Sequence, residues 1–190
     1  PYSYSSPLSY LKTNVDGAYN ILENAKRSNI EQLIMTSTSE VYGSAQYSPI
    51  DEKHPLVGQS PYSASKIAAD QLAISYFRSF KLPVKILRPF NTYGPRQSQR
   101  AIIPTIISQC LNSNIIRLGN LKPKRDFLYV SDTCQAFLNI ARKKNFFGEV
   151  FNVGSNQDIS ISDLVQNIKK LTNTNLQVKI DKKRIRHSGS

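Results

Sequence analysis

The stretch SPYSASKIAADQLAISYFRSFKLPVKIL (residues 60–87) decides the fold. It opens with Ser60 and Pro61, a helix N-cap followed by proline at the first helical position. Apolar residues then mark one side of a helix, at Ile67, Leu72, Tyr76, Phe77 and Phe80. Residues 83–87 are short and mostly apolar, which predicts a buried strand.

The same pattern precedes this stretch. Ser6 and Pro7 repeat the cap with proline, and apolar residues follow at helical spacing: Leu8, Leu11, Val15, Ala18, Leu22 and Ala25. Asn29 marks the end of that helix, residues 32–36 predict another buried strand, and a polar loop runs over 43–59. Two helix–strand pairs with short links predict a parallel sheet with crossover helices.

Beyond Gly94 and Pro95 the elements become shorter. Helices are predicted over 102–111, over 131–143 and from a capping box of Ser160 and Asp163 to about residue 171. Strands are predicted over 115–118, 127–130, 149–153 and 176–180. We therefore expect a sheet domain over 1–95 and a smaller lobe over 96–190, some of whose elements return to the sheet.

Length and composition limit the class of protein. With 190 residues and 39% hydrophobic content, the chain can bury one core, or one core and a small lobe. No apolar run approaches the length that spans a bilayer, so we expect no membrane segment. The first residues have neither an initiator Met nor the features of a signal peptide, so we expect the middle of a longer protein.

Charge and cysteines narrow the choice of partners. The net charge is +12, and basic residues crowd the C-terminus at Lys179, Lys182, Lys183, Arg184 and Arg186. Because no aromatic residues interleave with them, a solvated tail is favoured over a nucleic-acid surface, and an anionic small substrate accounts for the remaining excess. Cys110 and Cys134 form no CxxC and have no nearby His, so we expect no metal and two reduced core thiols in a cytoplasmic protein.

Tyr62 and Lys66 carry the first chemical signal. Four residues apart on one helix, they lie one turn from each other on the same face. A free phenol titrates at a pH of about 10, and a neighbouring ammonium lowers that pKa, so the pair makes a proton acceptor for a substrate hydroxyl. The spacing alone is a weak signal, because an exposed Tyr beside a solvated Lys gives the same pattern.

Polar side chains also follow both predicted strands. TSTSE (residues 36–40) closes the first strand, and RPFN (residues 88–91) closes the second. Taken alone, each segment is equally typical of an ordinary turn without a functional role. Because ligand sites in open α/β sheets lie outside the carboxyl ends of the strands, these two ends and the Tyr62 helix start favour one pocket.

These segments resemble the NAD-dependent epimerase/dehydratase family, the extended short-chain dehydrogenases that act on nucleotide sugars. The matching motifs stand in family order: TNVDGAYNILENAK (13–26), TSTSEVYG (36–43), SPYSASKIAAD (60–70), LRPFNTYGPRQ (87–97), RDFLYVSD (125–132) and VFNVGS (150–155). They are most similar to 4,6-dehydratases of the GDP-mannose and N-acetylglucosamine type. The resemblance implies an α/β fold, a Rossmann-like doubly wound parallel sheet lacking its N-terminal part here, with a small mixed α/β substrate lobe.

The resemblance also implies NAD as cofactor and a nucleotide-diphosphate sugar as substrate. Tyr62 would take the proton of the sugar C4 hydroxyl, Thr38 would hold the same hydroxyl, and Lys66 would hold the nicotinamide ribose and lower the Tyr62 pKa. Glu40 would take the proton at C5. The other implied contacts are Pro89 and Phe90 to the cofactor, Asn14 supporting the substrate site from the first helix, and Asn91 and Arg125 to the diphosphate. For Arg125 the alternative is a surface ion pair with Asp126.

The implied reaction is a dehydration. C4 is oxidised, water leaves across C5 and C6, and the hydride returns to C6, giving a 4-keto-6-deoxy sugar nucleotide. Many dehydratases carry Asp at the position of Ser39, so either Ser39 positions a water or Glu40 itself protonates the leaving hydroxyl. No GxxGxxG occurs among the 8 glycines, so the 190 residues alone should bind NAD poorly and be inactive. The chain also ends where the family would continue, so further substrate contacts are expected beyond it.

Three alternatives remain open. A C4 epimerase needs the Tyr62–Lys66 pair but no C5 base, so Glu40 argues against it. A decarboxylase can also carry Thr-Ser-Glu, although the SPYSASKIAAD helix favours a dehydratase. A non-catalytic binding module would be expected to lose one of these side chains. The resemblance further implies a full-length homodimer through the helices that start near Pro7 and Pro61, with candidate surface residues Leu11, Tyr19, Ile74 and Phe77.

Overall fold

The computed structural model describes residues 2–184, so Arg186 of the basic C-terminus lies outside the described residues. The described chain forms two compact units. The first unit holds residues 2–90 and 131–153, and the second unit holds residues 91–130 and 154–184. The chain therefore leaves the first unit at residue 90 and returns to it for one helix and one strand.

A three-stranded parallel sheet forms the centre of the first unit, as the helix–strand pattern predicts. Its strands are β1 (Leu33–Thr36), β2 (Val84–Pro89) and β7 (Val150–Val153), in the order β1-β2-β7. Thr36 lies opposite Leu87, and Pro89 lies opposite Val153. The carboxyl ends of all three strands therefore share one edge of the sheet.

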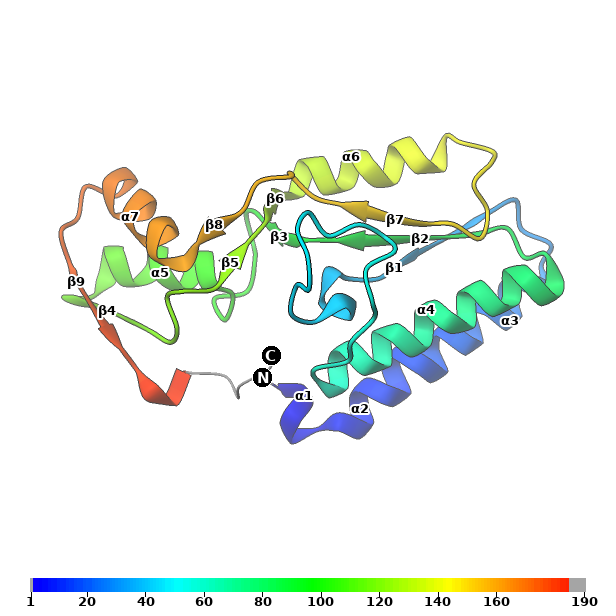
Figure 1. Ribbon diagram of the computed structural model, residues 1–190, viewed down its shortest axis with the longest axis horizontal. Coiled ribbons are helices and arrows are strands. Elements are labelled where there is room, and N and C mark those ends of the chain that lie inside the picture. Colours follow the sequence, from blue (N-terminus) through cyan, green and yellow to red (C-terminus); the bar gives the residue numbers. More distant parts are fainter. Residues whose placement is uncertain (1, 185–190) are drawn as a thin grey trace. The chain divides into compact units, whose positions relative to one another are not determined.

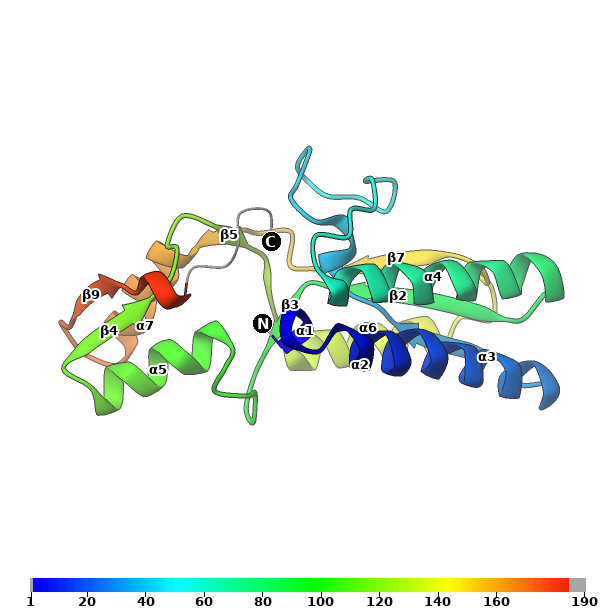
Figure 2. The ribbon, with the colours of Figure 1, turned by 90° about the horizontal axis from the view of Figure 1, so that it is seen from below.

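Helices cover both faces of this sheet. The helical segments before and between its strands are α1 (Tyr2–Ser5), α2 (Pro7–Leu11), a π-helical segment (Lys12–Asp16), α3 (Gly17–Arg27), α4 (Pro61–Phe80) and α6 (Val130–Ala141). In Figure 1, α6 lies above the strands and α3 and α4 lie below them; Figure 2 shows α3 and α4 running alongside each other. Between α3, α4 and the sheet lies a core that includes Leu22, Ala25, Ala73, Val84 and Ile86.

The helix starts show which sequence signals act as predicted. The hydroxyl of Ser60 accepts from the Ser63 amide at 3.1 Å and that of Ser63 accepts from the Ser60 amide at 2.9 Å, so the cap of α4 is confirmed. Ser6 and Pro7 stand at the predicted N-cap and first helical position of α2, but the Ser6 hydroxyl makes no cap hydrogen bond and pairs with that of Ser9 instead. Three residues of the predicted apolar faces are exposed, Leu8 by 60%, Leu11 by 45% and Phe80 by 53%.

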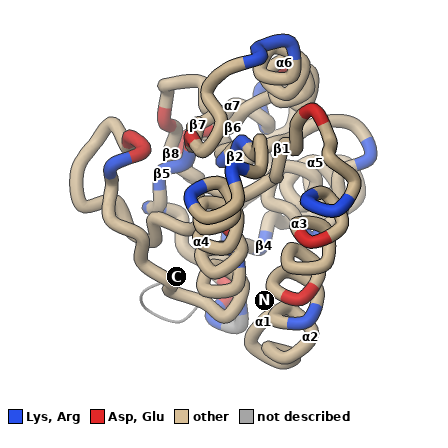
Figure 3. Tube along the Cα trace, turned by 90° about the vertical axis from the view of Figure 1, so that its right-hand side faces the viewer, with Lys and Arg blue, Asp and Glu red and all other residues tan. Residues whose placement is uncertain are grey.

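A buried lysine attaches α6 to the other face of the sheet. Lys85 of β2 is fully buried, and its ammonium donates to the Gln32 side chain and to the Ile140 carbonyl, each at 3.0 Å, and to the Lys143 carbonyl. Burial lowers the pKa of Lys85, while the carbonyls at the end of a helix favour a cation. Figure 3 shows further basic residues gathered where α6 ends.

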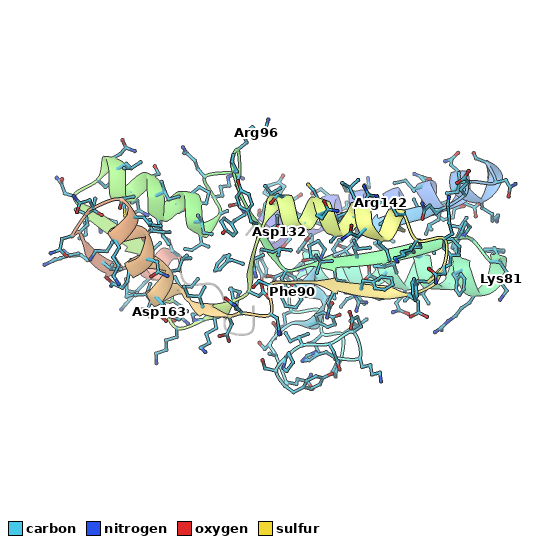
Figure 4. The ribbon with its side chains drawn as sticks, turned by 90° about the horizontal axis from the view of Figure 1, so that it is seen from above. Lys81, Phe90, Arg96, Asp132, Arg142 and Asp163 are labelled. Atoms are coloured by element: carbon cyan, nitrogen blue, oxygen red, sulfur yellow. The ribbon has the colours of Figure 1, made fainter. Side chains whose placement is uncertain are left out.

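The second unit contains three strand pairs and two helices. β4 (Ile115–Leu118) pairs in parallel with β9 (Gln177–Ile180), β3 (Asn91–Tyr93) in parallel with β6 (Phe127–Tyr129), and β5 (Lys124–Arg125) antiparallel with β8 (Ile159–Ser160). α5 (Ile102–Asn112) and α7 (Ile161–Leu171) pack on β4 around a core that includes Ile106, Ile116 and Val165. The chain then enters a 3₁₀ turn (Lys182–Arg184). Figure 4 labels Asp163 in the first turn of α7, where the Ser160 hydroxyl accepts from its amide at 3.0 Å. The predicted N-cap is confirmed, but the Asp163 carboxylate accepts from the Ser160 hydroxyl rather than from the Ser160 amide, so the capping box is incomplete.

Two predictions about single residues meet different outcomes. Both cysteines are free thiols, and Cys110 is buried in the core of the second unit. Cys134 is exposed, so its assignment to the core is wrong; it lies on α6, which buries none of its residues fully. Within residues 2–184, no helix is long and apolar enough to cross a membrane, and no three His, Cys, Asp or Glu side chains gather as metal ligands would.

Candidate active site

The predicted polar residues lie at the carboxyl edge of the first unit's sheet. Ser37 follows β1 and donates its amide to the Leu87 carbonyl of β2 at 2.7 Å. Phe90 follows β2 and donates its amide to the Val153 carbonyl at 2.9 Å. Figure 4 shows Phe90 at this edge and Lys81, just past the end of α4, at the opposite one. The segments 36–40 and 88–90 therefore end side by side, as the parallel arrangement requires.

The three residues after Ser37 are held in one tight turn. Thr38 is extended and caps a 3₁₀ helix (Ser39–Tyr42), accepting from the Glu40 amide through its hydroxyl at 3.2 Å. A serine, threonine or aspartate at an N-cap satisfies an amide that the helix leaves unpaired. This turn places Thr38, Ser39 and Glu40 within one short segment at the edge of the sheet.

Tyr62 and Lys66 meet this segment from the first turns of α4. The Tyr62 phenol lies beside the Thr38 side chain, which lowers the phenol's pKa, and its ring packs edge-on against Tyr10, with centroids 5.8 Å apart. The Lys66 ammonium donates to the Thr36 carbonyl at 2.6 Å. Two polar residues of the helix start thus lie against the last residue of β1 and against Thr38 just beyond it, which supports a single site.

The Tyr62 pKa shifts in the direction opposite to the one expected from Lys66. Burial is the largest cause and raises the pKa, the nearby Thr38 side chain lowers it, and the charge of Glu40 raises it further. Burial also lowers the pKa of Lys66, against the charge of Asp70. Because its pKa lies above the ordinary phenol value, Tyr62 is expected to be protonated at neutral pH, while the Lys66 ammonium donates to the Thr36 carbonyl.

Asn14 supports the site from the π-helical segment of the first helix. Its side-chain amide donates to the Ser65 hydroxyl at 2.9 Å, and that hydroxyl donates to the Tyr62 carbonyl at 2.7 Å. π-helical turns within α-helices occur frequently at functional sites. Asn14 therefore braces the backbone of Tyr62, through a buried serine that the sequence patterns do not single out.

A buried ion pair beneath the edge was also missed by the sequence patterns. Asp70 and Arg88 have side chains only 4% and 3% exposed, and the Arg88 Nε donates to Asp70 at 3.0 Å. One signal was available: Tyr62, Lys66 and Asp70 are spaced by four residues and share a helix face. Arg88 was predicted only as part of the polar segment 88–91 that closes the second strand, and nothing in that segment indicated a buried pair with Asp70.

The remaining predicted site residues, Asn91 and Arg125, belong to the second unit. The Asn91 side chain donates to the Asp126 carbonyl at 3.1 Å, and the Arg125 guanidinium donates to the Lys124 carbonyl at 2.9 Å. The Asp126 carboxylate accepts from the Ser155 amide and hydroxyl and from the Asn156 amide at 2.8–3.0 Å. The Asp126 carboxylate thus accepts hydrogen bonds from backbone amides and a serine hydroxyl rather than from the neighbouring Arg125 guanidinium.

The basic excess also concentrates in the second unit. Its described residues contain twelve Lys and Arg against four Asp and Glu, whereas the first unit contains twelve against nine. Only part of this excess belongs to the predicted C-terminal tail. A surface of this charge attracts anions.

Comparisons with known proteins agree with this arrangement. A family model described as GDP-mannose 4,6 dehydratase matches residues 1–189. A dTDP-D-glucose 4,6-dehydratase of Dictyostelium discoideum is 36% identical over 87% of this chain and 41% of its own length. The chain spans about half the length of the curated relatives it matches.

Solved structures share the fold over nearly the whole chain. The dTDP-glucose 4,6-dehydratase DesIV of Streptomyces venezuelae, determined with NAD and TYD bound, aligns with a TM-score of 0.87 and 27% identity over 96% of this chain and 57% of that one. A UDP-N-acetylglucosamine 4-epimerase of Methanobrevibacter ruminantium aligns with a TM-score of 0.88 and 30% identity over 100% of this chain and 61% of that one. The fold is therefore shared by dehydratases and epimerases.

Proposed function

The chain belongs to the GDP-mannose 4,6 dehydratase family, and from this premise we propose that it carries the catalytic residues of an NAD-dependent nucleotide-sugar 4,6-dehydratase, an enzyme of the lyase class. One observation carries the proposal: Tyr62, Thr38 and Lys66 gather at the edge where Glu40 also lies. An elimination that follows oxidation needs two proton acceptors at neighbouring carbons. This edge supplies a phenol and a separate carboxylate.

The residues at the edge fit the nicotinamide end of NAD. Tyr62 and Lys66 would hold its ribose, and Pro89 and Phe90 would line the space beyond β2, consistent with ligand binding outside the carboxyl ends of parallel strands. When bound, NAD supplies the acceptor and later the donor of the hydride that leaves C4 and returns to C6. The relative DesIV was determined with NAD. No glycine-rich pyrophosphate loop occurs within the 190 residues.

Tyr62 is proposed to take the proton of the C4 hydroxyl while Thr38 orients that hydroxyl. The raised pKa of Tyr62 sets a condition for this step. Lys66 must leave the Thr36 carbonyl and bring its ammonium toward the phenol, because a nearby positive charge lowers a phenol pKa. The four-residue spacing of the pair on α4 allows this with a change of side-chain rotamer alone.

Glu40 is proposed to remove the proton at C5, which the C4 ketone makes acidic. Its amide is fixed by Thr38, so its backbone position is coupled to that of the residue that orients C4. Ser39 lies between them and is proposed either to position a water or to leave protonation of the departing C6 hydroxyl to Glu40. A serine is itself a poor acid near neutral pH.

The substrate is proposed to be a nucleotide-diphosphate sugar. Asn14 would act from the first helix, and Asn91 and Arg125 of the second unit would contact the diphosphate. The guanidinium of Arg125 suits this, because it can bind a phosphate through two parallel hydrogen bonds, and the charge of its unit favours an anion. In this proposal residues 1–95 hold the cofactor and residues 96–190 the sugar nucleotide, apart from the helix and strand that return to the sheet.

A cytoplasmic homodimer is proposed for the full-length protein. Leu11 and Tyr19 are exposed by 45% and 49%, together with Leu8 on the same helix. Ile74 and Phe77 instead pack partly against the core, so they offer less surface than the sequence pattern suggests. Apolar area of this kind on neighbouring helices is typical of an interface.

The second candidate is a nucleotide-sugar 4-epimerase, favoured by the similarity to the Methanobrevibacter enzyme. A non-catalytic binding module would need none of the Tyr62, Lys66 and Glu40 arrangement. Incubating the full-length protein with NAD and a panel of nucleotide sugars distinguishes the three. A 4-keto-6-deoxy product supports the dehydratase; inversion at C4 without loss of water supports the epimerase; binding without turnover supports the module.

A further inference from the structure

The segment 37–42 is held at both ends by the same buried ion pair. At one end, the Ser37 hydroxyl donates to Asp70 Oδ2 at 2.8 Å. At the other end, Arg88 Nη1 donates to the Tyr42 hydroxyl at 2.9 Å. Arg88 Nε joins the two ends through its 3.0 Å bond to the same Asp70 oxygen. Thr38, Ser39 and Glu40 lie between these anchors.

We propose that Ser37, Asp70, Arg88 and Tyr42 form a clamp that positions Thr38, Ser39 and Glu40 for the reaction, a proposal that rests on the dehydratase function above. These four clamp residues touch neither substrate nor cofactor in this account. They act through the three residues they enclose. Sequence motifs do not single out the clamp, because its parts come from the residue after β1, from α4, from β2 and from the 3₁₀ helix over Ser39–Tyr42.

Burial makes the clamp stiff. Counting backbone and side chain together, the exposed fractions are 5% for Ser37, 3% for Asp70, 2% for Arg88 and 0% for Tyr42. A buried polar group that loses its partner cannot turn to water, and breaking one side of a buried ion pair is strongly unfavourable. The segment can therefore shift only by giving up hydrogen bonds that nothing replaces. A misplacement of about 1 Å at a reacting group can slow a reaction by about 100-fold.

The clamp also reaches the proton acceptor and the loop beyond it. Asp70 lies one helical turn from Lys66, and its charge opposes the burial that lowers the Lys66 pKa. On the other side, the Tyr42 hydroxyl donates to the side-chain oxygen of Asn152 at 2.7 Å, and the backbone N–H of Asn152 donates to the Glu52 carboxylate at 2.7 Å. The loop over residues 43–59, visible in Figure 1 beside the strand ends, is thus tied to the same pair.

Two single-atom changes test the clamp in the full-length protein. Tyr42→Phe removes one hydroxyl from the end nearest Glu40 and keeps the buried ring. Tyr47→Phe is the matched control, because the Tyr47 hydroxyl donates to Asp51 in the same loop and does not contact the ion pair. We expect Tyr42→Phe to lower kcat by about tenfold or more, within the range for misplaced groups, with KM nearly unchanged. The control should keep both constants.

The other end is tested by Ser37→Ala and its conservative counterpart Ser37→Thr, which keeps a hydroxyl for Asp70. We expect alanine to lower kcat and threonine to restore most of it. A role in folding alone would instead lower the amount of folded enzyme and leave kcat per folded molecule unchanged. Equal kcat in Tyr42→Phe, Ser37→Ala and wild type would overturn the clamp.

Amide hydrogen exchange over residues 38–43 separates the clamp from the proposed function. Both clamp variants should exchange faster than wild type there, while Tyr47→Phe should not. If wild-type protein forms no 4-keto product, the dehydratase function fails, yet this exchange still decides whether the clamp holds the segment. Unchanged exchange in both variants would overturn the clamp whatever the activity.

Discussion

Replacing Gly148 by alanine should destabilise the first unit strongly. Gly148 precedes β7 and has a φ of +83°, and a Cβ at this position would clash with Cδ1 of Phe77 and lie 2.7 Å from Cγ of the same ring. The positive φ costs an L-residue about 1–2 kcal/mol, and overpacking a filled core costs about 1–3 kcal/mol. We therefore expect the free energy of unfolding to fall by about 2–5 kcal/mol.

Gly17→Ala is the matched control for this change. Gly17 has a helical φ of −62° and no atom within 4 Å of the added Cβ. Alanine there should stabilise the protein by about 0.5–1 kcal/mol, because glycine loses more backbone entropy in a helix. Urea unfolding of the full-length protein, followed by circular dichroism, measures both effects.

A third variant separates the two causes of the Gly148 effect. Phe77→Leu removes the ring that the new methyl would strike but leaves the backbone conformation as it is. In that background Gly148→Ala should cost less than in wild type, a non-additivity expected of residues in contact. A loss below about 1 kcal/mol for Gly148→Ala alone, smaller than the φ term and the packing term together, would refute the reasoning.

Three further predictions concern a hydrogen bond between Tyr76 and Glu23, the thiols and the cofactor. The Tyr76 hydroxyl donates to Glu23 at 2.6 Å, which lowers the Glu23 pKa and raises that of Tyr76 to about 12. Stability from this bond should be fully present between the unfolded pKa values of 4.5 and 10.0, and it should be lost as the pH falls through the folded Glu23 pKa or rises through the folded Tyr76 pKa. The difference in free energy of unfolding between wild type and Tyr76→Phe should therefore vanish at both extremes of pH. A thiol reagent should modify Cys134 long before Cys110, because only Cys134 is exposed; equal rates by mass spectrometry would contradict the described packing. Calorimetry should find NAD binding to the 190-residue chain weaker than about micromolar, since no glycine-rich loop holds the pyrophosphate; tight binding would show that the loop is dispensable.

The sheet was predictable because its elements repeat strong local signals. A serine and proline open α4, a short apolar run gives β2, and the connections between helix and strand are too short for any arrangement but a crossover. The strands β3, β5 and β8 could not be predicted from the sequence, because each has only two or three residues and so shows no alternation of apolar and polar positions. The exposure of Leu8 and Phe80 was not predicted for a related reason: helical spacing identifies an apolar face of a helix but does not show whether another element covers that face.

The candidate site divides in the same way. Thr38, Glu40, Tyr62 and Lys66 lie in contiguous motifs, and the rule for strand ends brings them to one edge. Arg88 and Tyr42 belong to the site's support only through tertiary contacts, which no local pattern encodes. The sign of the Tyr62 shift could not be read from spacing either, since it depends on burial and on where the Lys66 ammonium points.

The central claim is that the edge carries two separate bases, and Glu40→Gln in the full-length protein tests it most directly. Gln keeps the shape of Glu but accepts no proton, and losing a general base costs about 10²–10⁴ in rate. With a nucleotide sugar, we expect oxidation at C4 to proceed while water loss stops. The absorbance of reduced cofactor should therefore build up with little 4-keto-6-deoxy product, whereas Tyr62→Phe should abolish both signals. Normal turnover by Glu40→Gln, or a wild-type protein that only inverts C4 and releases no water, would contradict the account.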